Sequence, residues 1–548
     1  MKRIGSLLLL LLLIGSNLIA QEKQVKNVIL LIPDGTSLSA VSAARWYQRY
    51  NHPELPHLNL DPYLCGTILT YSSDAPIGDS APTTSCYMTG HPSRAGFVAT
   101  YPPADSKNDI VPNDPERAYQ PMMTLLEAAR ITQNKATGLV FTCEFTHATP
   151  ADCASHSYNR GNYEWIAPQM VHNNIDVVLG GGVKLLNPDM KTYLEREGYG
   201  VFLNDLNSFR TYNGNKMWAL FRDMDMPYEL DRDPSLYPSL AEMARKAIDK
   251  LSENENGFIL MIEGSKVDWA AHANDAAALI TDMVAFDKAC GVAFDFAEKN
   301  GETLVVVVPD HGNSGFSIGT KRCPGYSHLS KEELFGPVSQ FKTSVDGLIA
   351  KLHDTDVSQL KDVVYDLTGI SLSDDEYTQI LQCSDYNRSS LSDEERMKGS
   401  KLTKVLANML TEHTCFGFTT TGHTGEEVFL AVFDPRAGQR LMGHHTNIEL
   451  HQYLRNAAGL GDLDALTNEY FAKHTDVFAG YPYTITTKNG VPTLEVKKDK
   501  KNTLEIQAGS NILKHNGKEV KLSSVVVHVD KNNTFYLPKS LKDLFTVK

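Results

Sequence analysis

Apolar runs recur along this sequence, and each of them ends in polar or charged residues. Residues 25–35 read VKNVILLIPDG, and the same pattern returns at 135–151, 256–268 and 301–315. Near-continuous apolar runs are typical of strands that are buried on both faces, as in a parallel sheet. The polar residues that follow would lie at the carboxyl ends of the strands, where α/β sheets bind their ligands.

Segments with helical periodicity lie between these runs. Residues 239–252 place their apolar side chains on one face at a spacing of about 3.6 residues. Residues 275–301 predict a second helix, which ends at Asn300-Gly301, a common C-terminal cap. The alternation of strand and helix predicts an α/β fold with a doubly wound, mostly parallel sheet flanked by helices.

The character of the chain changes twice after the last of these runs. Residues from about 325 to 410 are charged and helix-prone and lack apolar strands, which predicts a helical insertion that could cap a site. Residues 484–548 carry short alternating strands and an Asn516-Gly517 hairpin signal, which predict a small β-rich C-terminal module. We therefore expect one main domain over residues 21–483, interrupted by the insertion and followed by the module.

The N-terminus predicts export. A Lys2-Arg3 pair precedes an apolar stretch that reaches Ile14, and small and polar residues follow, as in a secretory signal peptide over residues 1–20. The apolar stretch is shorter than the ~20 residues that span a bilayer. No later segment resembles a transmembrane helix. We expect cleavage near Ala20 and a mature protein that is periplasmic or secreted.

Charge and cysteine content argue against two further classes. The 548 residues carry a net charge of −14 with no stripe of lysine and arginine, which argues against a protein that binds nucleic-acid backbones. Eight cysteines are too few for a disulfide scaffold, and no pair has the CxxC spacing of a zinc knuckle. In an exported protein some cysteines could be bridged, for instance Cys143 with Cys153, but the sequence leaves the pairing open.

Acidic and histidine side chains gather where the apolar runs end. Asp268 and His272 are four residues apart, so on a helix they would share a face and could bind one ion together. The other candidates at the ends of apolar runs, or just before one, are Asp34, Glu263, Asp310, His311 and His423. Buried carboxylates and imidazoles are costly unless they are paired or bound to metal. Zinc is favoured where histidines dominate, and magnesium where only oxygen ligands meet.

Ser80 lies in the segment PIGDSAPTTSCYMTG, residues 76–90. By itself an Asp-Ser pair is most often a turn or a helix cap. Beside two clusters of charged ligands, however, a serine suits metal-activated displacement on a phosphoryl or sulfuryl group. Metal coordination is one way to activate a hydroxyl that is a weak nucleophile at its own pKa.

Seven short motifs, in this order, resemble those of the alkaline phosphatases. They are IPDG, DSAPTTSCYMTG, HATPA, HSYNR, IEGSKVDWAAH, VVPDHG and GHTGEE, and they span residues 31 to about 427. The resemblance implies hydrolysis of phosphate monoesters at alkaline pH through a phosphoserine on Ser80, with release of phosphate and an alcohol. It implies small-molecule phosphomonoesters as substrates and is compatible with a homodimer; no nucleic-acid partner is expected.

The resemblance also implies a ligand set for each of three cations. It assigns one zinc to Asp268, His272 and His423, a second zinc to Asp34, Asp310 and His311, and a magnesium to Asp34, Thr149 and Glu263. It further implies that Arg160 clamps the substrate phosphate, a task for which the planar guanidinium fork is suited.

Two positions depart from the pattern of some members. His147 stands where some carry aspartate, and its imidazole could weaken the preference of the third site for magnesium or admit zinc. Trp269 stands where some carry a basic residue, so we expect a more apolar contact with the substrate there. Both residues are therefore candidates for substrate binding, together with Arg160.

Three other functions fit the sequence less well. A sulfatase would need a cysteine or serine at Gly90, and glycine supplies no nucleophile. A metal-dependent phosphodiesterase would generally lack the arginine clamp and the third site, whereas Arg160, Thr149 and Glu263 are all present. A non-catalytic binding protein should have lost Ser80 or a metal ligand, and none is lost.

Overall fold

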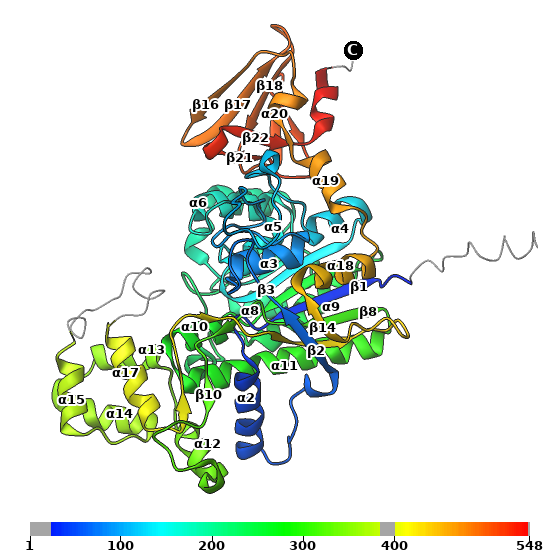
Figure 1. Cartoon of the computed structure of the whole chain (residues 1–548). Helices are drawn as coiled ribbons and strands as arrows, with labels where there is room; N and C mark the ends of the chain where they lie inside the picture. Colours follow the sequence, from blue (N-terminus) through cyan, green and yellow to red (C-terminus); the bar gives the residue numbers. More distant parts are fainter. Residues whose placement is uncertain (1–22, 384–400, 546–548) are drawn as a thin grey trace, which may run out of the picture.

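Figure 1 shows the chain as a computed structural model, which describes residues 23–383 and 401–545. The predicted signal peptide lies outside these described residues, as does part of the predicted insertion. Among the helices that are described, none combines the length and the apolar composition needed to cross a membrane.

A ten-stranded sheet forms the centre of the molecule, in the order β14-β2-β13-β8-β1-β7-β3-β4-β6-β5. The strands are β1 (Asn27–Ile32), β2 (Leu64–Leu69), β3 (Ala136–Glu144), β4 (Val177–Gly181), β5 (Gly200–Leu203), β6 (Met217–Leu220), β7 (Phe258–Glu263), β8 (Thr303–Val307), β13 (Val428–Phe433) and β14 (Gly443–Thr446). Neighbouring strands are parallel except at β13, which is antiparallel to both β2 and β8. The predicted mostly parallel sheet is confirmed.

The side chains of β1 show why the sheet is covered on both faces. Ile29 and Leu31 belong to one apolar core, and Leu30 and Ile32 belong to the other. Alternate residues of a strand point to opposite faces, so an uninterrupted apolar strand requires helices on both sides. The doubly wound arrangement follows from this pattern.

Helices pack on each face of the sheet. One face carries α2 (Leu38–Asn51), α9 (Leu240–Leu251) and α11 (Ala276–Asn300), and the other carries α3 (Ser80–Thr89), α4 (Leu125–Gln133), α5 (Ala148–Ala154), α6 (Tyr163–His172) and α18 (Asn447–Ala457). The predicted apolar face of α9 is buried throughout. Helix α11 ends at Gly301, whose φ of 69° is the left-handed conformation that glycine adopts at a helix end.

The predicted insertion is helical where it is described, and it lies at the lower left of Figure 1. Its helices are α12 (Lys331–Ser339), α13 (Val345–His353), α14 (Leu360–Thr368), α15 (Asp374–Leu381) and α17 (Lys401–Glu412). Helix α12 packs against α2, and α17 contacts α10 (Lys266–Ala273). The backbone N–H of Val345 also donates to the Asp275 carboxylate, which caps α11 (2.7 Å). The insertion therefore rests against the helix that carries Asp268 and His272.

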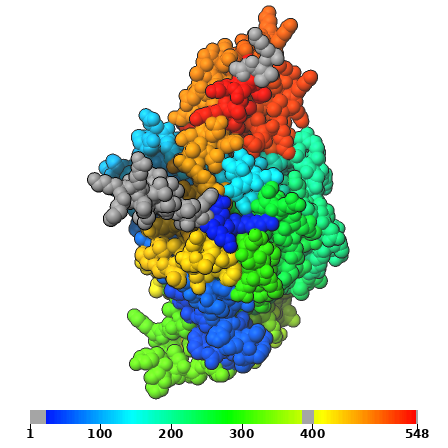
Figure 2. All heavy atoms as spheres, turned by 90° about the vertical axis from the view of Figure 1, so that its right-hand side faces the viewer, coloured from blue at the N-terminus to red at the C-terminus, as the bar shows by residue number. Residues whose placement is uncertain are grey.

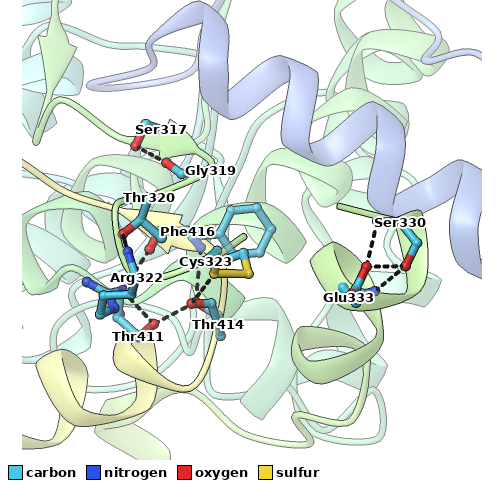
Figure 3. Close-up of a disulfide and its surroundings, with 11 residues drawn as sticks. Ser317, Gly319, Thr320, Arg322, Cys323, Ser330, Glu333, Thr411, Thr414 and Phe416 are labelled. Carbon is cyan, nitrogen blue, oxygen red and sulfur yellow. Dashed lines mark hydrogen bonds between the residues drawn. A yellow bond between two sulfur atoms is a disulfide. The ribbon is translucent and has the colours of Figure 1, made fainter. Parts of the chain in front are cut away.

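A disulfide joins Cys323 to Cys415 at the base of the insertion (Figure 3). Arg322, next to Cys323, donates to the backbone oxygens of Thr411 and Phe416, both at 3.1 Å. The suggested pairing of Cys143 with Cys153 was wrong, because both are buried free thiols. The Cys153 thiol donates to a backbone oxygen of its own helix, while the Cys143 thiol donates to the Glu263 carboxylate.

The C-terminal module is built from two antiparallel sheets, drawn in orange and red at one end of the molecule (Figures 1 and 2). The larger contains β16 (Tyr483–Lys488), β17 (Val491–Lys497), β18 (Thr503–Gln507), β19 (Ile512–His515) and β20 (Lys518–Lys521); the smaller contains β15 (Ala472–Lys473), β21 (Val527–Val529) and β22 (Thr534–Leu537). Asn516 and Gly517 both have positive φ and form the tight turn between β19 and β20, as predicted. The module contacts the main domain through polar pairs such as Tyr158 with Asp530 (2.7 Å).

Candidate active site at the carboxyl edge of the sheet

Parallel pairing brings the carboxyl ends of β1, β7 and β8 to one edge of the sheet. Ile32 is in register with Glu263, and Leu31 with Val307, so Asp34 and Asp310 follow directly at the same edge. Strand β13 runs in the opposite direction, so it begins at this edge and the segment that leads into it ends here. That reversal places His423 beside residues that come more than a hundred positions earlier in the chain.

Ser80 is the first residue of α3 and is buried at the same edge. Its Oγ lies 3.4 Å from each carboxylate oxygen of Asp34 and 3.2 Å from Nε2 of His311. The N-terminus of a helix carries a partial positive charge, which favours an anion at this position.

Gly35 allows two of the candidate carboxylates to approach each other closely. Its φ is 58°, and a Cβ atom at this position would lie 2.2 Å from Oδ1 of Asp268. A side chain here would therefore displace the Asp268 carboxylate or the turn that carries Asp34.

Asp268, His272 and His423 form the first cluster. Nε2 of His272 lies 3.4 Å from the Asp268 carboxylate and 3.1 Å from Nε2 of His423. The Nδ1 atoms of the two rings face the backbone oxygens of Thr421 (2.6 Å) and Gly78 (2.9 Å). Because a carbonyl accepts only, each Nδ1 carries the proton, and both Nε2 atoms present lone pairs to each other. A cation bound between the two Nε2 atoms would accept both lone pairs and remove their repulsion.

Asp34, Asp310 and His311 form the second cluster. Nε2 of His311 lies 3.5 Å from Asp34 and 3.3 Å from Oδ2 of Asp310, while its Nδ1 faces the backbone oxygen of Gly312 at 3.1 Å. Oδ1 of Asp310 accepts from two backbone N–H groups, whereas Oδ2 is buried without a hydrogen-bond donor. Here too, two acceptors face each other, Nε2 of His311 and the unpartnered Oδ2 of Asp310.

The third group lies around Glu263, at the end of β7. Oε1 of Glu263 and Oγ1 of Thr149 are buried without hydrogen-bond partners, and the carboxylate of Asp34 is close by. Sγ of Cys143 lies 3.4 Å from Oε2 of Glu263. The sequence suggested Cys143 only as half of a disulfide, so its place in this group was not predicted.

The pKa values of these groups are shifted because they are buried and because several ionisable groups lie close together. Burial and the nearby carboxylates of Asp310, Asp268 and Glu263 raise the pKa of Asp34 well above its usual range. Burial raises the pKa of Glu263 to about 8. Burial and the nearby His311 lower the pKa of His423 to about 4, which leaves its ring neutral and able to bind a metal at alkaline pH.

Arg160 lies at the mouth of the site and is held by two neighbours. Its Nη1 donates to Oδ1 of Asp79 at 2.6 Å, and its Nη2 donates to Nε2 of His147 at 3.2 Å. Burial opposes the ionised form of Asp79, but Arg160 outweighs it and lowers the pKa of this carboxyl to about 2. Burial, followed by the charge of Arg160, lowers the pKa of His147 to about 3, so its ring is neutral.

Trp269 lies next to Asp268 and completes the wall beside His147. The two rings meet edge to face with centroids 5.5 Å apart. Nζ of Lys266 lies 3.9 Å from the centroid of the indole, and this ammonium is also paired with Asp225. The indole of Trp269, with the Lys266 ammonium against it, therefore lies on this side of the site.

Two positioning residues were not predicted from the sequence. Asp79 holds Arg160 and also accepts from the backbone N–H of Gly96 at 3.1 Å. Asn313 donates to Oδ1 of Asp268 at 2.6 Å. Both stand beside residues that we selected for their chemistry, and that adjacency is the signal that could have identified them.

The fold and this arrangement define a class of hydrolase that acts on phosphate esters, and comparison with known proteins agrees. The alkaline phosphatase family model matches residues 25–460. The chain therefore belongs to the alkaline phosphatase family, and it is an enzyme that hydrolyses phosphate monoesters.

Curated relatives have the same activity in their names. Alkaline phosphatase 3 of Bacillus subtilis is 32% identical over 453 residues, which cover 79% of this chain and 90% of that protein. Repressible alkaline phosphatase of Saccharomyces cerevisiae is 28% identical and covers 83% of this chain and 85% of its own length.

Solved structures confirm the fold. A cold-active alkaline phosphatase from Shewanella sp. aligns with a TM-score of 0.66 at 26% identity, covering 79% of this chain and 99% of that one. The alkaline phosphatase of Thermus thermophilus aligns with a TM-score of 0.69 at 25% identity, covering 80% of this chain and 93% of that one.

Proposed function

We propose that this enzyme cleaves small-molecule phosphate monoesters at alkaline pH through a phosphoserine on Ser80. The observation that carries the proposal is the position of the Ser80 hydroxyl, at a helix N-terminus and within 3.4 Å of both Asp34 and His311. This hydroxyl contacts the second cluster, and Arg160 pairs with Asp79, the residue next to Ser80 in the chain.

The residues fit three divalent cations. Asp268, His272 and His423 would hold one zinc, Asp34, Asp310 and His311 would hold the second, and Asp34, Thr149 and Glu263 would hold a third ion. The opposed Nε2 lone pairs and the unpartnered oxygens of Asp310, Glu263 and Thr149 support this assignment. When bound, such ions favour the alkoxide of serine, stabilise a leaving oxygen and activate water.

The chain's own residues then carry out two displacements. Arg160 binds phosphoryl oxygens with its planar fork, and Asp79 keeps that fork oriented. Ser80 Oγ attacks phosphorus, the bond to the alcohol oxygen breaks, and the alcohol leaves with a proton. Water next attacks the phosphoserine and releases phosphate, which restores the Ser80 hydroxyl. Two in-line attacks give net retention of configuration at phosphorus.

We also propose export to the periplasm or the medium after cleavage near Ala20. The N-terminal sequence supports this proposal. The disulfide between Cys323 and Cys415 supports it independently, because disulfides persist in oxidising compartments. The homodimer suggested by the family resemblance stays a prediction.

Hydrolysis of p-nitrophenyl phosphate and bis-p-nitrophenyl phosphate at alkaline pH tests the function. We expect a strong preference for the monoester, loss of activity on chelation and recovery with zinc and magnesium. Ser80→Ala should abolish turnover and the acid-stable phosphoprotein that is trapped by quenching. Preference for the diester would contradict the role given to Arg160, and full turnover by Ser80→Ala would exclude the phosphoserine.

A further inference from the structure

Cys143 reaches the third cation site from the strand next to the one that carries Glu263. Strands β3 and β7 are parallel neighbours, with Val140 in register with Ile262, so their carboxyl ends meet. The Cys143 side chain is fully buried, and its Sγ lies 3.4 Å from Oε2 of Glu263. Neither the cation assignments above nor the proposed displacements use this thiol.

Other polar groups around the thiol also indicate that a cation binds here. Cys143, His147 and Glu263 each offer one donor atom, and the three atoms lie within 4.8 Å of one another. Oε1 of Glu263 and Oγ1 of Thr149 are fully buried and have no hydrogen-bond partner. A buried carboxylate oxygen without a donor costs free energy unless a cation satisfies it.

The separation of the sulfur and oxygen atoms suits one zinc ion. Zinc binds thiolate sulfur at ~2.3 Å and carboxylate oxygen at ~2.0 Å, which places the two ligands about 3.5 Å apart at a tetrahedral angle. The observed separation is 3.4 Å. Magnesium prefers six oxygen ligands and avoids thiolate, so a sulfur atom at this position works against it.

His147 is less available than Cys143 as the metal ligand that would make this site prefer zinc to magnesium. Its Nε2 accepts a hydrogen bond from Nη2 of Arg160, so in the neutral ring the proton lies on Nδ1. Binding an ion through either nitrogen would break that hydrogen bond. Binding an ion through Sγ of Cys143 would replace only the hydrogen bond from the thiol to Glu263, which is itself a residue of the third site.

We propose that the Cys143 thiolate is a ligand of the third ion and that this site takes zinc in preference to magnesium. The thiol releases its proton to solvent when the ion binds, and a sulfur–metal bond forms without any change of oxidation state. The inference rests on the proposed function, because it specifies the ion of a site that the proposed function contains.

The wild-type enzyme provides the first test, which needs no variant. With cobalt(II) replacing the native ions, we expect a thiolate-to-cobalt charge-transfer band in the near ultraviolet. The first and second clusters offer only nitrogen and oxygen donors, so such a band reports the third site. Absence of the band from enzyme that has bound about three equivalents of cobalt would overturn the proposal.

Metal content in matched variants provides the second test. After equilibration with zinc and excess magnesium, we expect about three zinc ions per wild-type chain, but about two zinc ions and one magnesium in Cys143→Ser. Removing even an outer partner of a metal typically weakens binding 10–100-fold, so zinc affinity at this site should fall at least about tenfold. Cys290→Ser is the control, because Cys290 is equally buried but lies on α11.

The outcomes separate this inference from the proposed function. If Cys143→Ser and the wild type hold the same ions while the phosphoserine still forms, the thiolate assignment is wrong and the proposed function stands. If metal-loaded wild type shows the cobalt band but forms no phosphoserine, the proposed function fails instead. Unfolding of Cys143→Ser would leave the cobalt spectrum of the wild type to decide.

Discussion

Arg160 is held by Asp79 on one side and by His147 on the other, and these two partners differ in charge. The carboxylate of Asp79 pairs with the guanidinium at 2.6 Å, whereas the neutral ring of His147 only accepts a hydrogen bond. A phosphate oxygen is a stronger acceptor than a neutral imidazole. We therefore expect a substrate to displace His147 and leave Asp79 in place.

Replacing Arg160 by lysine tests the need for a planar fork. Arg160→Lys keeps the charge but loses one of two parallel hydrogen bonds, each worth about 1.5–3 kcal/mol when a charge is involved. We expect kcat/KM for p-nitrophenyl phosphate to fall about 10–100-fold in steady-state assays. Arg210→Lys is the control, because Arg210 forms a similar fork with Glu242 on the surface. An equal loss of kcat/KM in both variants would contradict the role of Arg160 in binding the substrate phosphate.

The ion pair of Asp79 makes a second prediction, on stability against pH. The pKa of Asp79 falls from 3.8 to about 2 in the folded chain, so ionisation stabilises the fold above pH ~4. This contribution is lost as pH falls through about 2. In urea unfolding of metal-free protein, we expect the difference between wild type and Asp79→Asn to shrink over that window. A difference that is constant from pH 5 to about 2 would show that the pair does not matter.

Single residues also mark the limit of what the sequence could predict about the site. Asp34 and Asp268 were predicted because they follow apolar runs, and Ser80 was predicted because of the motif in which it lies. The position of Cys143 was not predicted, because only strand pairing brings it next to Glu263. The spatial neighbours of a cysteine on a strand cannot be inferred from the sequence until the order of the strands is known.

At the scale of elements, apolar runs predicted strands well, whereas strand direction had to come from the structure. The runs that became β1, β3, β7 and β8 were identified as parallel strands because helices separate them. The run that became β13 looks the same in sequence but pairs antiparallel with β2 and β8. The insertion leaves from the carboxyl end of β8 and returns to the same edge of the sheet, so no crossover is made and β13 runs antiparallel to β8.

The disulfide at the base of the insertion supplies a prediction at this scale. It closes a loop with a sequence separation of 92, and such cross-links typically stabilise a fold by about 2–4 kcal/mol. We expect reductant to lower the thermal midpoint of the wild type. The double variant Cys323→Ser/Cys415→Ser should start from the lower midpoint and should not respond to reductant. A wild-type midpoint unaffected by complete reduction would contradict this role.

At the scale of the whole molecule, the cations are expected to hold the fold together as well as to serve catalysis. Four fully or nearly fully buried carboxylates meet at one edge of the sheet, those of Asp34, Glu263, Asp268 and Asp310. Bound cations or protons would relieve their mutual repulsion.

We therefore predict that chelation lowers the thermal midpoint at pH 8 together with activity. A ligand present at about 1,000 times its Kd stabilises the folded state by ~4 kcal/mol. Calorimetry with and without EDTA measures the shift, and restored zinc should reverse it. The midpoint should fall less on chelation at pH 5 than at pH 8, because protons then replace cations on groups such as Glu263, whose pKa is about 8. A midpoint unchanged by chelation at pH 8 would contradict this.

The insertion, which separates β8 from His423 in the chain, also determines when the site is completed during translation. Ser80, Arg160, Asp268 and His272 are synthesised before the insertion, whereas His423 emerges only after it. A nascent chain that stops within the insertion has the serine and the clamp but cannot close the first cluster. We expect premature termination to yield an inactive product, so that catalytic competence requires translation beyond His423.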